Sequence, residues 1–501
     1  MNRLNHLDQV CKNVCSLAIT VMALCALDAS AAEGNIHVAV PIIPARSVNL
    51  TNFDAVGDGV ALNTKAFEEA IAALSAKGGG ELIVPPGYWL TGPIRLKSDI
   101  NLHLERGALI QFSRDFHLYP LVAINMKGEN AVDSTSPISG IGLENVAITG
   151  EGIIDGGGDA WRPVKREKLP VPEWRALVAS GGVVDAQGAT WWPSRDAMEG
   201  NRVVALLERT NCLDPAEYEP AHQYLRPKMV RLIGCHKVLL AGVTFQNPPS
   251  WTLNPALCED VTIQNVNVHN SYAAQNSDAL DVESCKRVKV RDCTFDAGDD
   301  GICLKSGKDA AGRRRGVPDE DILIEGCVVY HAHGGFVIGS EMSGGVRNVC
   351  VNNCTFIGTD NGLRFKSARG RGGTVEKIFI SNVRMEDILA NAIDFEMFYE
   401  KQAGARQGAN PPAVNAGTPR FRDIHIENMV CRGAHRAMVL GGLPEMPLRD
   451  CVLKNVSISA QFGAFVFDAE NIRFDNVHID QASGERLKQT RVKNSFLEVA
   501  L

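Results

Sequence analysis

The 501-residue chain is poor in aromatic side chains and has no excess of positive charge. Aromatic residues make up 6% of the sequence while glycine is plentiful at 47 residues, and this combination favours a turn-rich β architecture over a helical one. The formal net charge of −7 argues against nonspecific binding to nucleic acid. The length is enough for one large domain or for several of ordinary size.

Long apolar runs are missing outside the N-terminus. Residues 14–27 form an apolar stretch that is too short to span a membrane comfortably, and the small residues 29–31 follow it like a cleavage site. We therefore expect residues 1–31 to be a secretory signal; a buried N-terminal helix is the alternative. Residues 32–501 are then an exported protein, periplasmic or secreted, with no membrane segment in its mature form.

Cysteine patterns typical of metal clusters are also missing. No CxxC pair is followed by further Cys or His at zinc-ligand spacing, so we expect no metal and no cofactor. Of the 14 cysteines, three fall in the predicted signal, and the odd number of eleven remains. We expect the others to be small core residues stacked on one another, with one or two disulfides as the alternative. Those nearest β-like segments are Cys235, Cys258, Cys285, Cys293, Cys327, Cys350 and Cys354.

What the chain does contain is a recurring β unit. From Asn145 onward a charged residue precedes a β-branched alternation and then a second short strand, as in EDVTIQNVNV and KRVKVRDCTF. We take the first inward apolar residues of nine units to be Val238, Val261, Val288, Ile322, Val349, Ile378, Ile424, Val452 and Ile472.

The intervals between these residues run from 20 to 46 and centre on the high twenties. Such a period predicts a repeat whose loops vary while its strands keep register. The absence of long helices between strands excludes a doubly wound α/β fold. We therefore predict an all-β protein, a single-stranded parallel β-helix, with a propeller as the alternative.

Two regions stand outside the repeat. A short amphipathic helix after Asn63, with Phe67, Ile71 and Leu74 on one face, is expected to cap the N-terminal end of the solenoid. Residues 157–227 lack the unit and hold four of the six tryptophans, so we expect an insertion there. Its tryptophans stack on sugar rings or form a small satellite core.

Several polar residues recur at the coil spacing. Asp278 and Asp300 are 22 residues apart, the next step of 33 leads to His333, and a further 31 leads to Arg364. Residues one coil apart lie above one another, about 4.8 Å away. Asp299 and Lys366 adjoin this series, so the sequence predicts one groove with three carboxylates, a histidine and two cations. Flanking glycines, from Gly298 to Gly362, are expected to leave room for substrate.

Crowded carboxylates raise at least one pKa and leave a protonated acid beside ionised bases. Hydrolysis of a glycosidic bond requires this pair of groups. Arg364 and Lys366 suit an anionic sugar, because a guanidinium binds a carboxylate through two hydrogen bonds. Taken singly, GDDG is more often a solvated turn or a calcium ligand, and HGG is usually a simple turn.

Four ordered motifs extend this hypothesis. The segments NSDALD, AGDDGICLKSG, HAHGGFVIGS and RFK resemble the Asn-Thr-Asp, Gly-Asp-Asp, Gly-His-Gly and Arg-Ile-Lys elements of the polygalacturonases, glycoside hydrolase family 28. Ser277, Ala332 and Phe365 replace the family's Thr, Gly and Ile. The resemblance covers about Phe53 to Tyr399.

The resemblance implies a right-handed parallel β-helix and inverting hydrolysis without a metal. It implies that Asp299 is the general acid, that Asp278 and Asp300 activate water, and that His333 supports the protonation state of the acid. By the same resemblance Arg364 and Lys366 hold the substrate carboxylate, Asn276 orders the site, and Tyr399 is an aromatic near the cleaved sugar.

The expected substrate is a pectic polysaccharide or oligogalacturonide, and we favour attack from a chain end because residues 157–227 could wall off the groove. The same motifs leave a rhamnogalacturonan hydrolase open. Two readings from other classes are a calcium-dependent pectic lyase and a catalytically silent carbohydrate-binding β-helix. The oligomeric state is left open.

Overall fold

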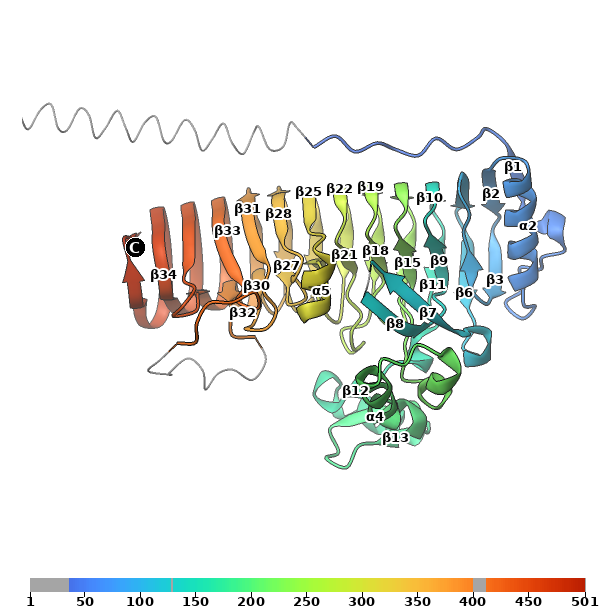
Figure 1. Cartoon of the computed structure of the whole chain (residues 1–501), viewed down its shortest axis with the longest axis horizontal. Coiled ribbons are helices and arrows are strands. Elements are labelled where there is room, and N and C mark those ends of the chain that lie inside the picture. Colours follow the sequence, from blue (N-terminus) through green and yellow to red (C-terminus); the bar gives the residue numbers. More distant parts are fainter. Residues whose placement is uncertain (1–35, 128, 400–410, 501) are drawn as a thin grey trace, which may run out of the picture.

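The computed structural model describes residues 36–127, 129–399 and 411–500; the predicted signal, residues 1–31, lies outside them. The chain forms a long solenoid of short strands that runs from the N-terminal helix α2 to β34 near the C-terminus (Figure 1). Its strands pair in parallel with strands of the preceding and following coils. The predicted right-handed parallel β-helix is confirmed, and the propeller is excluded. Within the described residues, no helix has the length and apolar character needed to cross a bilayer.

The strands stack in three columns along the solenoid. The first column consists of β1 (Ser47–Asn49), β2 (Gly80–Val84), β5 (Ile100–Leu104), β10 (Glu144–Gly150), β16 (His236–Ala241), β19 (Glu259–Gln264), β22 (Lys286–Arg291), β25 (Asp319–Glu325), β28 (Val346–Asn352), β31 (Thr374–Ser381) and the start of β33 (Arg420–Gly441). The second consists of β3 (Gly87–Thr91), β6 (Ala108–Phe112), β11 (Ile153–Asp155), β17 (Thr244–Gln246), β20 (Asn267–His269), β23 (Thr294–Asp296), β26 (Val328–Tyr330), β29 (Thr355–Ile357) and the start of β32 (Arg384–Glu396).

The third column carries the candidate site. It consists of β4 (Ile94–Arg95), β9 (Ile138–Ile141), β15 (Val230–Ile233), β18 (Leu253–Ala256), β21 (Leu280–Glu283), β24 (Ile302–Lys305), β27 (Phe336–Gly339), β30 (Leu363–Lys366) and the end of β32. In the last coils, β32, β33, β34 (Leu448–Lys493) and β35 (Phe496–Ala500) turn the corners as continuous strands.

Helix α2 (Thr64–Ala76) covers the N-terminal end of the solenoid (Figure 1). Its residues Phe67, Ile71 and Leu74 are buried, as predicted. Asn63 precedes the helix as expected, but its side chain makes no capping hydrogen bond; it binds the backbone of Val56 instead. The helix shields the edge of the first coil from pairing with another chain.

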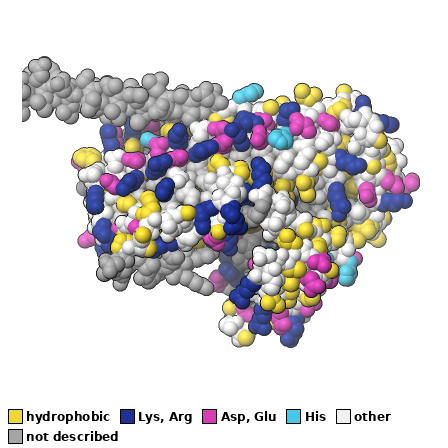
Figure 2. Space-filling model, in the orientation of Figure 1, with side chains coloured by type: hydrophobic (Ala, Val, Ile, Leu, Met, Phe, Trp, Pro, Cys, Tyr) yellow, Lys and Arg dark blue, Asp and Glu magenta, His cyan; other side chains and the backbone are white. Residues whose placement is uncertain are grey.

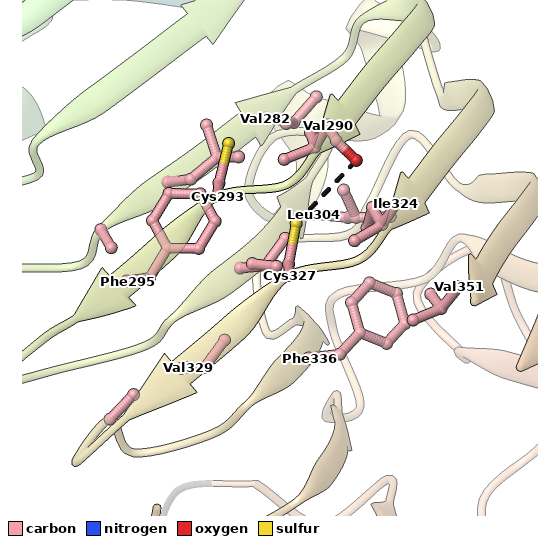
Figure 3. Packing of buried hydrophobic residues seen from close by; sticks show 14 of the residues in the cluster. Val282, Val290, Cys293, Phe295, Leu304, Ile324, Cys327, Val329, Phe336 and Val351 are labelled. Carbon is pink, nitrogen blue, oxygen red and sulfur yellow. Dashed lines mark hydrogen bonds between the residues drawn. The ribbon is translucent and has the colours of Figure 1, made fainter. Parts of the chain in front are cut away.

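The core is one continuous file of inward-facing side chains. Figure 3 shows Cys293 and Cys327 from successive coils beside Phe295 and Phe336. Cys327 lies with its sulfur 3.9 Å from the carbonyl oxygen of Val290. All eleven cysteines of the described residues are free, and all but Cys212 are buried, so the stacked-core prediction is confirmed.

The register agrees with the predicted repeat until its eighth member. From Val238 to Ile424 each predicted residue lies opposite the next. The partner of Ile424 is Cys451, whereas Val452 lies opposite His425, so the choice of Val452 is wrong. Strand side chains alternate between faces, and the buried Cys451 occupies the inward place as a small apolar residue.

Asparagine recurs because the coils turn in the left-handed region. Asn382, Asn428 and Asn455 have φ values of 54°, 55° and 52°, a conformation that Asn tolerates better than most residues. Their side chains bond from coil to coil; Asn455 donates to Asn428 at 3.1 Å. Figure 2 shows charges of both signs interspersed over the side of the solenoid that faces the viewer.

Two segments project from the third column. The antiparallel hairpin of β7 (Leu121–Met126) and β8 (Glu129–Ser134) lies beside β9 and β15 (Figure 1). Residues 157–227, called the arm below, form none of the three columns. Their helices and strands are α3 (Val171–Ala179), α4 (Arg195–Arg209), β12 (Val164–Lys165), β13 (Val183–Val184) and β14 (Thr190–Trp192), with the 3-10 helices η3 (Gly158–Ala160), η4 (Arg166–Lys168) and η5 (Pro215–Ala221).

Three of the four tryptophans of the arm serve packing. Trp161 is buried and meets the ring of Phe116 edge-on, with centroids 4.4 Å apart. Trp174 and Trp191 are buried as well. These three residues follow the satellite-core alternative rather than the sugar-stacking one.

Candidate active site

The predicted residues gather where each coil passes from the second column to the third. Asp278 precedes β21, Asp299 and Asp300 precede β24, and His333 precedes β27. The backbone locks these corners together: Ala279 N–H donates to the Asp300 carbonyl at 2.9 Å, and His333 N–H to the Asp299 carbonyl at 2.8 Å. The predicted stacking over successive coils is therefore confirmed.

The glycines at these corners serve packing of the coils. A Cβ on Gly298 would lie 2.5 Å from the carbonyl oxygens of Ser271 and Ala274 in the preceding coil. A Cβ on Gly335 would lie 2.3 Å from the ring of Phe356. What these glycines admit is the neighbouring coil, so the expectation that they leave room for substrate is wrong for them.

Asp299 and His333 form a direct pair. His333 Nδ1 lies 3.1 Å from Asp299 Oδ1, which also accepts the N–H of Asp300 at 3.0 Å. Burial raises the pKa of Asp299, but the hydrogen bond with His333, with help from the charge of Lys366, outweighs burial and lowers it to about 2. The free protein therefore holds Asp299 ionised at neutral pH.

Asp300 faces the two predicted cations. Lys366 Nζ lies 2.7 Å from Asp300 Oδ2, and Arg364 Nη1 lies 3.9 Å from Oδ1. Tyr399 stands beside both, with its ring centroid 5.3 Å from Lys366 Nζ and 5.8 Å from Arg364 Cζ. Burial lowers the pKa of Lys366, yet the charge of Asp300 raises it overall, so the ammonium stays charged.

The rise in pKa that crowded carboxylates were expected to cause affects Asp278 and Asp281, and both residues are buried. Burial, then the charges of Asp281 and Asp299, raise the pKa of Asp278 well above its usual range. Burial raises the pKa of Asp281 to about 7, although Lys305 opposes the rise. The protonated carboxyls of the free site are thus these two, and not Asp299.

Lys305 holds this carboxylate cluster together. Its ammonium lies 3.4 Å from Asp281, 3.8 Å from Asp278 and 3.3 Å from Glu341. It also lies 4.5 Å from the ring centroid of Trp251. The charge of Lys305 lowers the pKa of Glu341 to about 2.

Asn276 is linked to the site through the arm. Arg226 donates to Asn276 Oδ1 at 2.7 Å and to the Gln275 carbonyl at 2.9 Å. Burial lowers the pKa of Arg226 to about 10, which leaves the guanidinium charged at neutral pH. The arm delivers a second cation, Lys168, whose Nζ lies 3.2 Å from His333 Nε2.

Asp299, Asp300 and His333 place one potential ligand atom each within 4.8 Å of one another. Their protein partners compete with a metal ion, because Lys366 contacts Asp300 and the His333 imidazole contacts Asp299. Carboxyls of different proton affinity beside cations suit acid–base cleavage of an anionic substrate.

The structure brings all eight predicted residues into one neighbourhood and adds others that the sequence analysis missed. Asp281 and Lys305 lie inside the quoted motifs, on the adjacent strands β21 and β24. Their side chains meet although the strand register sets Cys303 opposite Asp281 and Glu283 opposite Lys305, so coil spacing alone does not connect them. Trp251 and Glu341 lie outside the quoted motifs, so the sequence points to them less clearly. Lys168 and Arg226 belong to the arm, and no spacing rule connects them to the coils.

Comparison with known proteins agrees with this geometry. The model of the glycosyl hydrolases family 28 matches residues 216–483. A probable polygalacturonase of Vitis vinifera is 28% identical over 83% of this chain and 74% of its own, and an exo-poly-alpha-D-galacturonosidase of Dickeya chrysanthemi is 26% identical over 86% and 70%. The solved hyperthermoactive exopolygalacturonase of Thermotoga maritima is 33% identical, with a TM-score of 0.73, over 89% of this chain and 96% of that one.

Proposed function

The chain belongs to the glycosyl hydrolases of family 28, and on that premise we propose that it hydrolyses α-1,4-galacturonosidic bonds of pectin from a chain end. The observation that carries the proposal is the contact of Lys366 with Asp300, beside Arg364 and one coil from Asp278. This contact places two cations that suit a uronate, Arg364 and Lys366, next to the carboxyls that perform acid–base chemistry.

In the proposed reaction, Asp299 protonates the leaving glycosidic oxygen while Asp300 activates water on the opposite side of the sugar. Asp278 joins Asp300 as a base once it has released the proton that it holds in the free protein. Lys366 holds the Asp300 carboxylate in place by direct contact. Arg364, Lys366 and Tyr399 hold the sugar and its carboxylate, and Asn276 is fixed by Arg226 at the border of the site.

Substrate binding leads to protonation of Asp299, which can then act as the general acid. Burial alone would raise the pKa of Asp299, but the hydrogen bond with His333 and the positive charge of Lys366 lower it in the free protein. A bound uronate neutralises part of this charge and excludes water, so the pKa of Asp299 rises and a proton is taken up. His333, at 3.1 Å, is placed to share that proton.

Attack from a chain end is supported by the β7–β8 hairpin rather than by the arm alone. Met126 of the hairpin packs on Ile233 and Ala256 of the third column. Asp133 of the hairpin binds Arg231 at 2.8 Å and Lys228 at 3.1 Å. The hairpin therefore covers the column on the N-terminal side of the catalytic coils.

A pocket of about 210 Å³ lies between this hairpin and the catalytic coils. Its lining includes Trp251, Lys228 and Lys305, which give an aromatic face and positive charge for a terminal uronic sugar. On the C-terminal side a second cavity of about 560 Å³ continues along β32 to β34, in keeping with a groove that leads away in that direction.

The substrate class of this proposal is a pectic polymer or oligomer. A polymer of this kind is met outside the cell, which agrees with the export predicted from residues 1–31; export itself stays a prediction.

The test is the product profile on polygalacturonate at low conversion. We expect galacturonate monomer alone, and no product from an Asp299→Asn variant, because loss of a general acid lowers the rate by about 10²- to 10⁴-fold. A ladder of oligomers would contradict exo action, and cleavage of a rhamnogalacturonan backbone without cleavage of polygalacturonate would contradict the substrate.

A further inference from the structure

The arm places one cation directly against the proposed catalytic pair. Lys168, at the end of η4, has its Nζ 3.2 Å from His333 Nε2 and 3.6 Å from the ring centroid of Tyr272. His333 uses its other nitrogen, Nδ1, to contact Asp299. Lys168 and Asp299 therefore stand at opposite nitrogens of one imidazole.

The contact between Lys168 and His333 determines which imidazole nitrogen carries the proton and which N–H groups of Lys168 remain to bind a further partner. A lysine ammonium has three N–H donors and no acceptor, so Nε2 of His333 must accept and Nδ1 carries the proton that faces Asp299. One N–H of Lys168 serves His333 and its charge rests over Tyr272, which leaves donors for a further partner. Asp360 also approaches Nε2, but at 3.9 Å.

Lys168 makes no ion pair with any carboxylate in the part of the chain that the structure describes. The other cations of the site do: Lys305 contacts Asp281 and Lys366 contacts Asp300. A half-buried ammonium whose partners are an imidazole and an aromatic ring is suited to accept an anion from a ligand.

We propose that Lys168 binds the carboxylate of the uronic sugar on the leaving-group side of the scissile bond. The inference rests on the proposed function. It follows from the contacts: Asp299 is the group proposed to give its proton to the leaving oxygen, and Lys168 contacts the opposite nitrogen of the imidazole that contacts Asp299. Arg364 and Lys366 contact Asp300 instead, so the two sets of cations serve carboxylates on different sugars of one polyuronate.

The arm is anchored well enough to hold such a residue in place. Before Lys168, the buried Arg162 donates to Asn247 at 2.8 Å. After it, Arg226 binds Gln275 and Asn276 at the edge of the site. The arm that carries Lys168 is thus tied to the solenoid by partly buried contacts both before and after this residue in the sequence.

The test is a thermodynamic cycle in which the charge of Lys168, the charge of the substrate carboxylate, or both are removed. Hydrolysis of digalacturonate is compared with that of digalacturonate methyl-esterified on its reducing-end sugar, in the wild type and in Lys168→Met. Lys168→Arg keeps the charge, and Arg202→Met removes an exposed cation elsewhere on the arm.

We expect Lys168→Met and the ester each to lower kcat/KM by about tenfold or more, chiefly through KM, because each removes one charge-assisted contact. Combined, they are expected to cost little more than either alone, Lys168→Arg to recover most of the loss, and Arg202→Met to have no effect. Additive losses, or a Lys168→Met enzyme that equals Arg202→Met, overturn the inference. A wild type that cleaves neither digalacturonate nor its ester overturns the proposed function itself.

Discussion

Lys366 and Asp300 form a buried ion pair, with 2.7 Å between Nζ and Oδ2 and side chains that are 7% and 1% exposed. The lysine comes from β30 and the aspartate from the corner before β24, two coils earlier. The contact thus couples the group expected to hold a uronate to a group expected to activate water.

Replacing Lys366 with Met is expected to abolish measurable hydrolysis and to destabilise the protein. Removing one partner of a buried ion pair leaves an uncompensated charge, at a cost of about 3–5 kcal/mol. The free energy of unfolding, measured with urea, checks the second part. Lys237→Met is the matched control, because Lys237 pairs with Glu144 at the surface. Equal stability of the two variants would contradict the role given to Lys366.

Asp281 predicts a pH dependence of stability. Its pKa is about 7 in the folded state, above about 3.9 for an unfolded aspartate, so the folded state binds more protons between these values. The free energy of unfolding therefore falls as pH rises from about 4 to about 7, by about 4 kcal/mol from this group.

Asp281→Asn mimics the protonated carboxyl and is expected to remove this part of the slope. The variant matches the wild type near pH 4 and exceeds it in stability above pH 7. Urea unfolding across this range is the measurement, with the exposed Asp292→Asn as control. A wild-type stability slope that persists unchanged in Asp281→Asn would refute the assignment.

Asp133 holds the β7–β8 hairpin against the third column through Arg231 and Lys228. Asp133→Ala is expected to loosen the hairpin, to open the N-terminal side of the groove, and to add short oligomers to the products of polygalacturonate. Chromatography of early products checks this. If Asp133→Ala folds and still releases monomer alone, the hairpin does not set the exo pattern.

The free cysteines make a prediction about the core. In the chain from residue 32 onward, one thiol per molecule, that of Cys212, is expected to react readily with a thiol reagent. The ten others react only after unfolding, because they are buried. Fewer than eleven reactive thiols in unreduced, denatured protein would reveal a disulfide and contradict the stacked core.

The sequence was sufficient for the solenoid because its signals are local and periodic. The inward apolar residues from Val238 to Ile424 recur at the coil spacing, and each lies opposite the next one in the structure. The pattern failed at Val452, where a cysteine takes the inward place and shifts the apparent register by one residue. The repeat period alone does not decide whether Cys451 or Val452 faces inward, whereas the pairing with the neighbouring strand does.

The site was predictable to the extent that it stacks. Asp278, Asp300 and His333 follow the coil spacing and were found. Lys168 reaches His333 from a segment that obeys no repeat, so only the folded arm reveals it. The distribution of protons was not predictable either, since the low pKa of Asp299 depends on its contact with His333 and not on the number of nearby carboxylates.

The central claim is single-displacement hydrolysis of a galacturonosidic bond at a chain end. The most direct measurement is the proton magnetic resonance spectrum of the first products from trigalacturonate, recorded before the anomers equilibrate. We expect free galacturonate to appear first as the β anomer, together with digalacturonate. First appearance of the α anomer, or of an unsaturated product that absorbs in the ultraviolet, would contradict it.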